Sequence, residues 1–241
     1  MKDIKNAIIL VSGGLDSVVT AYNVKNNLGY ETLKFLYMDY AQRAIKEEEY
    51  CSRKIAKLLK ADFIKIKIPW LGKISTAFIN KNDKIPKTTE KDLEDGRKEI
   101  INWWVPTRNS IFIINALAHS EYYFIKDKKR YDIFMGLINE GQVFMKDTTE
   151  KFIKKVNELS EEATYHGGYK IITPLIKMDK TEVIKLGKKL NVPFRYTYSC
   201  YIKNGFKKGI PLHCGECLNC MLRKKGFYWA GIKDPSLYTK K

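Results

Sequence analysis

The sequence predicts an α/β fold, in which a Rossmann-like parallel sheet with helices on both faces is followed by a small metal-binding region. Three observations predict it. Short apolar runs alternate with helical patterns through much of the chain. The first apolar run leads directly into a turn with two glycines and then into a helix. Four of the five cysteines fall within 21 residues near the C-terminus.

The expected elements follow one another in the order that βαβ units require. Apolar runs predict strands at 7–11, 32–38, 62–68, 133–137 and 170–172. Helical periodicity predicts helices at 16–27, 47–59, 108–123, 148–164 and 181–190. Right-handed crossovers between such strands give a parallel sheet. Residues 72–104 are polar, lysine-rich and weakly periodic, which indicates a long loop of the kind that often acts as a lid or binding loop.

The composition is that of a soluble globular protein, with 44% hydrophobic and 29% charged residues. No apolar run reaches the roughly 18 residues that a membrane span needs. The N-terminal residues lead straight into the first strand, without the apolar stretch and cleavage site of a signal peptide. We therefore expect no membrane association and a cytoplasmic location.

The formal net charge of +17 raises the question of nucleic-acid binding, because lysine and arginine neutralise phosphates. The lysines are spread through every segment, however, and a positive field also attracts small anionic substrates. We expect direct nucleic-acid binding to be absent and most of this charge to lie on solvated surface.

The turn after the first strand has the composition of a phosphate-binding loop. Glycines let backbone N–H groups face a polyphosphate without interference from Cβ, and a helix N-terminus adds the positive end of its dipole. Ser12 and Ser17 can each donate a hydroxyl hydrogen bond. Asp16 is a candidate ligand for the Mg²⁺ that bridges phosphates. The predicted nucleotide-binding residues are Leu10, Val11, Ser12, Gly13, Gly14, Leu15, Asp16 and Ser17.

The cysteines near the C-terminus have the spacing of a metal site. Cys214, Cys217 and Cys220 form two overlapping CxxC units, and Cys200 lies 14 residues upstream. Four thiolates without an open position are typical of structural zinc. An iron–sulfur cluster is the alternative; zinc is favoured because nothing else in the sequence indicates redox chemistry. We assign 1–195 to an α/β domain and 196–241 to a zinc-binding region packed on it.

The loop sequence SGGLDS resembles the signature of the N-type ATP pyrophosphatases, whose fold is adenine nucleotide alpha-hydrolase-like and which cleave ATP between the α and β phosphates. With the cysteine motif, it resembles the 7-cyano-7-deazaguanine synthase family, which makes the nitrile precursor of queuosine and archaeosine. Further matches are DYAQR at 39–43, VPTRN at 105–109, GLINE at 136–140, TPL at 173–175, KTEVI at 180–184 and the block from Cys200 to Pro235.

Two departures from the family pattern stand out. Ala41 replaces a glycine of the family's DYGQR stretch. Many members also carry a GYPDC or FPDN segment where the deazaguanine is expected to bind, whereas this chain has VFMKDTT at 143–149. The segment keeps an aromatic residue and Asp147, but lacks the proline. The resemblance therefore bears more directly on the fold, ATP use and zinc than on the base-like substrate.

The resemblance implies a ligase that turns 7-carboxy-7-deazaguanine and ammonia into 7-cyano-7-deazaguanine. One ATP would adenylate the carboxylate, and ammonia would displace AMP to give the amide. A second ATP would activate the amide oxygen, whose loss gives the nitrile. ATP, Mg²⁺ and Zn²⁺ are the implied cofactors. The candidate catalytic residues are Asp16, Arg108 and Lys180, and the candidate substrate-binding residues are Arg43, Asn139, Glu140 and Asp147.

Two other functions stay open from the sequence. The altered 143–149 segment would suit a related ligase that joins an activated deazaguanine to a protein amine. The basic C-terminal region would suit a tRNA-modifying ATP pyrophosphatase. A tRNA thiolase usually needs a catalytic cysteine pair outside the structural site, and only Cys51 remains here. A homodimer is possible in either case.

Overall fold

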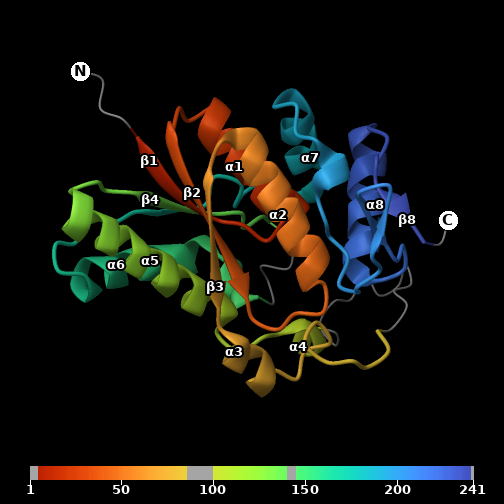
Figure 1. The fold of residues 1–241 in the computed structure, drawn as a ribbon, viewed down its shortest axis with the longest axis horizontal. Coiled ribbons are helices and arrows are strands. Elements are labelled where there is room, and N and C mark those ends of the chain that lie inside the picture. Colours follow the sequence, from red (N-terminus) through yellow and green to blue (C-terminus); the bar gives the residue numbers. More distant parts are fainter. Residues whose placement is uncertain (1–4, 86–99, 140–144, 240–241) are drawn as a thin grey trace.

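The computed structural model describes residues 5–85, 100–139 and 145–239, and these form a five-stranded parallel sheet in the order β3-β2-β1-β4-β5 (Figure 1). The strands are β1 (Asn6–Leu10), β2 (Thr32–Asp39), β3 (Asp62–Lys67), β4 (Asp132–Met135) and β5 (Ile171–Ile172). Every strand pair of this sheet is parallel. The Rossmann-like parallel sheet predicted from the sequence is confirmed.

Helices cover both faces of the sheet, as predicted. One face packs against α1 (Leu15–Asn26), α2 (Ile45–Leu59) and α7 (Lys180–Lys189). The other face packs against α5 (Arg108–Asp127) and α6 (Glu150–Ala163), which lie together on the left in Figure 1.

Burial on both faces explains why the strands are continuous apolar runs rather than alternating ones. In β1, Ile8 and Leu10 belong to the core under α5 and α6, whereas Ala7 and Ile9 belong to the core under α1 and α7. Neither kind of position meets water. No helix of the described residues is both long and apolar enough to cross a membrane.

The segment expected to be one long loop contains two short helices in its described parts. Helix α3 (Pro69–Ile74) overlaps its start, and α4 (Ile100–Trp103) lies near its end. The reason is tertiary: the Trp103 ring stacks on Tyr201 with centroids 4.2 Å apart and meets the edge of Phe78 at 5.5 Å. These contacts order a stretch whose local sequence carries little helical periodicity.

The C-terminal region has its own small sheet and one helix, which the sequence did not predict. Strands β6 (Phe206–Lys207), β7 (Ile210–His213) and β8 (Leu237–Tyr238) lie in that order, and α8 (Leu218–Ala230) packs against α7. Two 3₁₀ turns complete the described elements, at Lys146–Thr148 and Phe194–Tyr196. A Cβ at Gly226 would lie 2.6 Å from the Lys180 Cγ, so only glycine allows this close approach of α8 to α7.

Arg223 on α8 joins the C-terminal segments. Its side chain is only 1% exposed and makes two hydrogen bonds to the carboxylate of Asp234, at 3.0 and 3.2 Å. It also donates to the hydroxyls of Thr197 and Ser199 and to the carbonyl of Phe194. The guanidinium is therefore satisfied by two segments distant in sequence.

Replacing Arg223 with methionine should destabilise the protein by about 3–5 kcal/mol, because the Asp234 carboxylate would be left buried without its counter-charge. The free energy of unfolding from denaturant titration measures this. The matched control is Arg195→Met, since Arg195 is exposed, and it should change the value by less than about 0.5 kcal/mol. Equal effects of the two substitutions would contradict the anchoring role.

Candidate active site and metal centre

A cavity that is bordered by several of the predicted residues lies at the carboxyl ends of the parallel strands. It has a volume of about 280 Å³ and is bordered by the residues that follow β1, β2 and β4. The chain runs from β1 outward to β2 and β3, then crosses to β4 and β5 on the other side. Ligands of open parallel sheets bind at such a switch point, here between β1 and β4.

The predicted phosphate loop borders this cavity and is ordered by its own hydroxyl groups. The Ser17 hydroxyl accepts a hydrogen bond from the Ser12 amide at 3.2 Å and donates to the Gly14 carbonyl at 3.1 Å. The Gly14 amide donates to the Ser12 hydroxyl at 3.2 Å. Gly13 has a φ of +72°, a left-handed conformation that favours glycine.

Two close approaches fix the position of the loop. A Cβ at Gly13 would lie 2.4 Å from the carbonyl oxygen of Glu48 on α2. A Cβ at Gly136, just after β4, would lie 2.9 Å from the backbone of Asp16 and Ser17. In addition, the Tyr198 amide donates to the Gly13 carbonyl at 2.7 Å. Gly136 and Tyr198 were not predicted as site residues.

Asp16 and Lys180, both predicted as catalytic, form an ion pair. The Lys180 ammonium lies 2.8 and 3.0 Å from the two carboxylate oxygens of Asp16. Lys180 is the first residue of α7, and the N-cap Asp179 and Glu182 form a capping box that fixes this end of the helix. The pair places a cation beside the start of α1.

Arg108 also borders the cavity, at the first position of α5 and after Thr107, whose φ is +50°. Burial disfavours its charge, but the fields of Tyr40 and Asp147 outweigh burial and raise the pKa of the guanidinium. Burial raises the pKa of the Asp147 carboxyl, and the positive charge of Arg108 offsets part of this increase. The Asn109 side chain donates to the Asp147 carbonyl at 3.2 Å and holds that turn against α5.

Of the other three predicted substrate-binding residues, Arg43 and Asn139 differ in their position relative to the cavity. Arg43 borders the cavity, and its guanidinium donates to the Asp83 carbonyl at 2.7 Å. Asn139 is exposed and is not among the described residues that border the cavity; its amide donates to the Met178 carbonyl. Glu140 lies outside the described residues.

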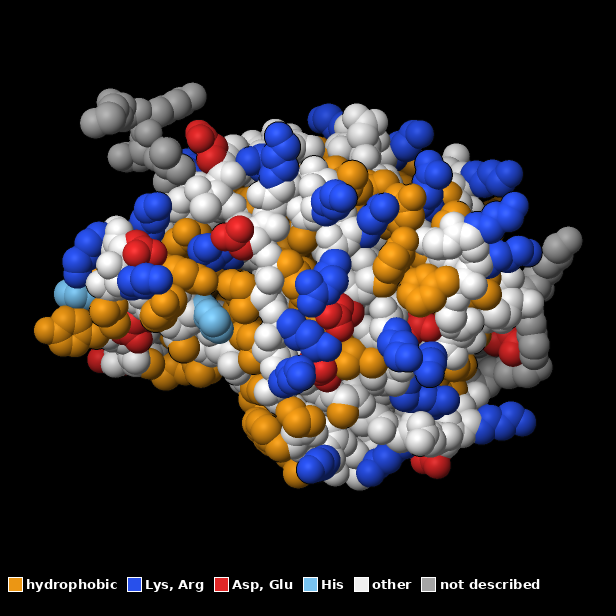
Figure 2. Space-filling model, in the orientation of Figure 1, with side chains coloured by type: hydrophobic (Ala, Val, Ile, Leu, Met, Phe, Trp, Pro, Cys, Tyr) orange, Lys and Arg blue, Asp and Glu red, His pale blue; other side chains and the backbone are white. Residues whose placement is uncertain are grey.

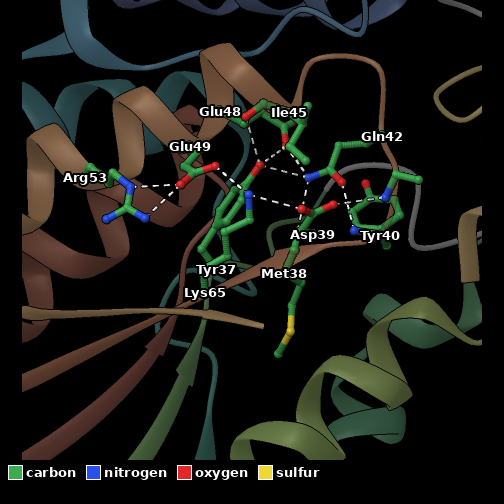
Figure 3. Close-up of polar contacts among 11 residues, drawn as sticks. Tyr37, Met38, Asp39, Tyr40, Gln42, Ile45, Glu48, Glu49, Arg53 and Lys65 are labelled. Atoms are coloured by element: carbon green, nitrogen blue, oxygen red, sulfur yellow. Dashed lines mark hydrogen bonds and ion pairs between the residues drawn. The ribbon is translucent and has the colours of Figure 1, made fainter. Parts of the chain in front are cut away.

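A polar network that the sequence did not reveal forms one wall of the cavity (Figure 3). The Gln42 side chain donates to Glu48 at 2.8 Å, to the Tyr37 hydroxyl at 3.0 Å and to the Met38 carbonyl at 3.1 Å. Burial raises the pKa of the Glu48 carboxyl to about 7, although Gln42 and Arg108 oppose the shift. Glu48 is therefore a carboxyl group that changes charge near neutral pH.

The four predicted metal ligands converge. The sulfur atoms of Cys200, Cys214, Cys217 and Cys220 all lie within 4.8 Å of one another and are buried. Backbone amides donate to two of the sulfurs, from Cys214 and Ile202 to the Cys200 sulfur at 3.4 Å and from Cys217 to the Cys214 sulfur at 3.3 Å. Such hydrogen bonds stabilise thiolates, so this cluster could hold a metal ion.

Outside the cavity, lysine and arginine side chains are spread over much of the face shown in Figure 2, with apolar and uncharged groups between them. Among the described residues visible there, the positive charge does not collect in a single patch.

Comparison with known proteins assigns the chain to a family. The family model described as "Queuosine biosynthesis protein QueC" matches residues 6–231, which include the phosphate loop and the cysteine cluster.

The chain belongs to the QueC family.

Three named relatives are similar in sequence to this QueC-family chain over nearly its full length. The 7-cyano-7-deazaguanine synthase of Methanococcus maripaludis strain C7 is 37% identical, over 96% of this chain and 98% of the relative. The enzyme of the same name from Methanocaldococcus jannaschii is 36% identical over 97% and 99%, and that from Methanosphaera stadtmanae is 32% identical over 97% and 98%. The prediction of an ATP-using enzyme, a ligase of queuosine biosynthesis, is confirmed.

The raised pKa of Glu48 should make the QueC-family chain less stable as pH rises. The unfolded chain ionises this carboxyl near its ordinary value of 4.5, whereas the folded chain holds the proton up to about 7. Between these values folding binds a proton, so the free energy of unfolding falls with pH, by up to about 3 kcal/mol. Glu48→Gln should remove this fall, as measured by urea titrations between pH 4 and 8.

The neighbouring Glu49→Gln is the control with the opposite sign. Lys65 and Arg53 outweigh the effect of burial and lower the pKa of Glu49, so its ionised form stabilises the fold. This substitution should reduce stability at neutral pH and have little effect below pH 4. If Glu48→Gln leaves the slope of stability against pH unchanged, Glu48 is not buried in a protonated state.

Proposed function

We propose that this chain converts 7-carboxy-7-deazaguanine and ammonia to 7-cyano-7-deazaguanine at the expense of ATP. The observation that carries the proposal is the cavity at the β1/β4 switch point, where a phosphate loop and the side chains of Arg108 and Lys180 surround one space. The names of the relatives support the choice of substrate and product.

The reaction would proceed in two adenylation steps. The substrate carboxylate attacks the α phosphorus of ATP and releases pyrophosphate, and ammonia then displaces AMP to form the amide. The amide oxygen attacks a second ATP, and loss of that oxygen as AMP leaves the nitrile. In each step two anions must meet, so the protein must supply positive charge at the phosphates.

The residues for the ATP end are those of the loop and its ion pair. The amides at 12–17 and the N-terminus of α1 would bind the phosphates, and Lys180 would balance the charge of the departing pyrophosphate. Asp16 would hold Mg²⁺, and the ion would supply Lewis-acid stabilisation of the negative charge on the phosphates. Its carboxylate is half-buried and directed to the Lys180 ammonium, so it is already oriented at this end of the cavity.

The residues for the base-like substrate lie toward α5. Arg108 can grip a carboxylate with two parallel hydrogen bonds. Phe112 and Tyr201 also border the cavity and offer apolar surfaces for a planar ring. The carboxylate of Asp147, which lies near enough to Arg108 to influence its pKa, would accept hydrogen bonds from the guanine-like edge. Arg43, Asn139 and Glu140 remain candidates from the sequence.

We further propose that the four cysteines hold Zn²⁺. Sulfurs about 2.3 Å from one ion at the corners of a tetrahedron lie about 3.8 Å apart. Cys214 and Cys220 are 3.8 Å apart, and Cys200 and Cys217 are 3.9 Å apart. The arrangement fits a single ion, whereas a cluster of several iron atoms would require wider separations. A homodimer and the absence of direct nucleic-acid binding also stay predictions.

The purified chain with MgATP, ammonium and 7-carboxy-7-deazaguanine should form the amide and the nitrile, as mass spectrometry would detect. Gly13→Ala should abolish both products, because its Cβ would collide with the Glu48 carbonyl. Gly29→Ala is the matched control, since Gly29 also has a φ of +72° but no atom within 4 Å of the added Cβ. It should retain at least half of the wild-type rate.

The outcome for the wild type decides the proposal. AMP release with another acceptor, without amide or nitrile from this substrate, would favour the ligase that modifies a protein amine. Equal loss of activity in the two glycine variants would show that backbone strain, rather than the packing of the loop, is responsible.

Elemental analysis should find one zinc per chain and no stoichiometric iron. Cys217→Ser should lose the zinc and unfold more easily, because the sulfurs would lose the ion that holds them together. Cys51→Ser is the control, since Cys51 lies outside the cluster, and it should retain the metal. Stoichiometric iron with sulfide would refute the zinc assignment.

A further inference from the structure

The proposed reaction leaves one chemical task without a residue. Nitrogen enters as ammonium and ends in a nitrile, which carries no hydrogen. A base must therefore remove a proton before the nitrogen attacks the acyl adenylate, and again before AMP leaves to form the nitrile. This inference rests on the proposed function and concerns the group that receives those protons.

Few groups around the cavity can act as that base. Among the described residues that border it, the carboxylates are Asp16 and Glu48. Asp16 is held by Lys180 at 2.8 Å. Tyr40 is too weak an acid to be ionised near neutral pH, because burial raises its pKa to about 12. Cys200 belongs to the metal cluster.

The environment of Glu48 suits the task. One of its carboxylate oxygens, Oε2, accepts from Gln42 at 2.8 Å and lies 3.5 Å from the Tyr37 hydroxyl. The other oxygen, Oε1, accepts no hydrogen bond from any residue in the described part of the chain. The Glu48 carbonyl packs against Gly13, so the residue lies beside the phosphate loop. Figure 3 shows the Gln42 side chain, from the loop before α2, close to Glu48 in the first turn of that helix.

We propose that Glu48 is the catalytic base that binds ammonium and takes up its protons during amide and nitrile formation. The Oε2 contacts hold the carboxylate in place at the border of the cavity, and Oε1 would receive the proton. Arg108 lies close enough to exert an electrostatic effect on Glu48, so the cation that would bind the substrate carboxylate is near the base.

Proton uptake by Glu48 accompanies each change of bonding at the nitrogen. Glu48 accepts a proton from ammonium, the neutral nitrogen bonds to the acyl carbon, and the carbon–oxygen bond to AMP breaks. The nitrogen that has bonded to the acyl carbon then loses a second proton, which gives the neutral amide. After the second adenylation, loss of the remaining nitrogen protons accompanies cleavage of the carbon–oxygen bond, and the electron pairs become the triple bond. Glu48 passes each proton to solvent before accepting the next.

The charged and titratable groups around Glu48 come from several elements. Tyr37 and Tyr40 face it from the end of β2, Arg108 from α5, and Glu47 and Cys51 from its own helix. Burial is the largest influence, and it brings the pKa of Glu48 to about 7. A base of this pKa both accepts and releases protons readily near neutral pH. The ammonia-dependent rate should therefore increase as pH rises through 7.

The test compares two nucleophiles on the same adenylate. Ammonia is almost wholly protonated at neutral pH, whereas hydroxylamine is largely unprotonated and needs no base before it attacks. Glu48→Gln keeps the shape of the side chain and an oxygen for Gln42 but cannot accept the proton. It should lower amide and nitrile formation by about 100-fold or more. Hydroxamate formation and substrate-dependent ATP–pyrophosphate exchange should stay within about threefold of wild type.

Glu49→Gln is the matched control, because it removes one negative charge from the adjacent position of α2 without touching the cavity. It should leave both products within about twofold of wild type. Equal loss of hydroxamate and amide in Glu48→Gln would overturn the proposal and assign Glu48 a structural role, as would wild-type amide formation. A wild-type chain that shows no exchange with 7-carboxy-7-deazaguanine would instead refute the proposed function itself.

Discussion

The site depends on the absence of two Cβ atoms. At Gly13 the backbone of the phosphate loop lies against the carbonyl of Glu48 on α2, and at Gly136 the end of β4 lies against the start of α1. Any other residue at either position would push an element away. The loop backbone is thus fixed by packing, and if it binds ATP as proposed, such a preorganised site would spend no free energy on reorientation during the reaction.

Close packing also concentrates charge in a small, poorly solvated space. Arg108, Lys180, Asp16 and Glu48 all border the same cavity. Each would be costly to bury alone, and the structure offsets this cost differently: Asp16 and Lys180 pair directly, whereas Glu48 remains partly protonated. The result is a cavity with net positive charge and a neutral or singly charged carboxyl group on its wall, which suits anionic substrates.

The sequence predicted the sheet and the convergence of the four cysteines because each has a strong local pattern. Buried parallel strands read as apolar runs, and the ligands of the cluster follow a fixed spacing. It did not predict α3, α4 or α8. For α4 the reason is tertiary, since Trp103 stacks on Tyr201, and α8 packs against α7. Asn139 is exposed and lies outside the lining of the cavity, and its role as a substrate contact stays a prediction.

Glu48 was missed because it stands in a run of three glutamates that looks like solvated helix surface. A signal was present: Cys51, Ser52 and Ile55 follow it at helical spacing, and all are buried. A carboxylate on the buried face of an amphipathic helix should have been treated as a candidate site residue. Tyr198 carried no comparable local signal, because its hydrogen bond to Gly13 joins segments distant in the chain. The Gln42 hydrogen bonds reach only four to six residues away, but they follow no periodic pattern.

The cysteine region and the phosphate loop are mechanically connected. The Tyr198 amide donates to the Gly13 carbonyl, and Cys200, two residues later, belongs to the cluster of four cysteines. Between them, the Ser199 amide donates to the His213 ring, and its hydroxyl accepts from Arg223 on α8. A change in the cluster would therefore move the segment that supports Gly13. Loss of the proposed zinc would be expected to disturb the proposed phosphate loop as well as the cysteine region, through the hydrogen bond between Tyr198 and Gly13.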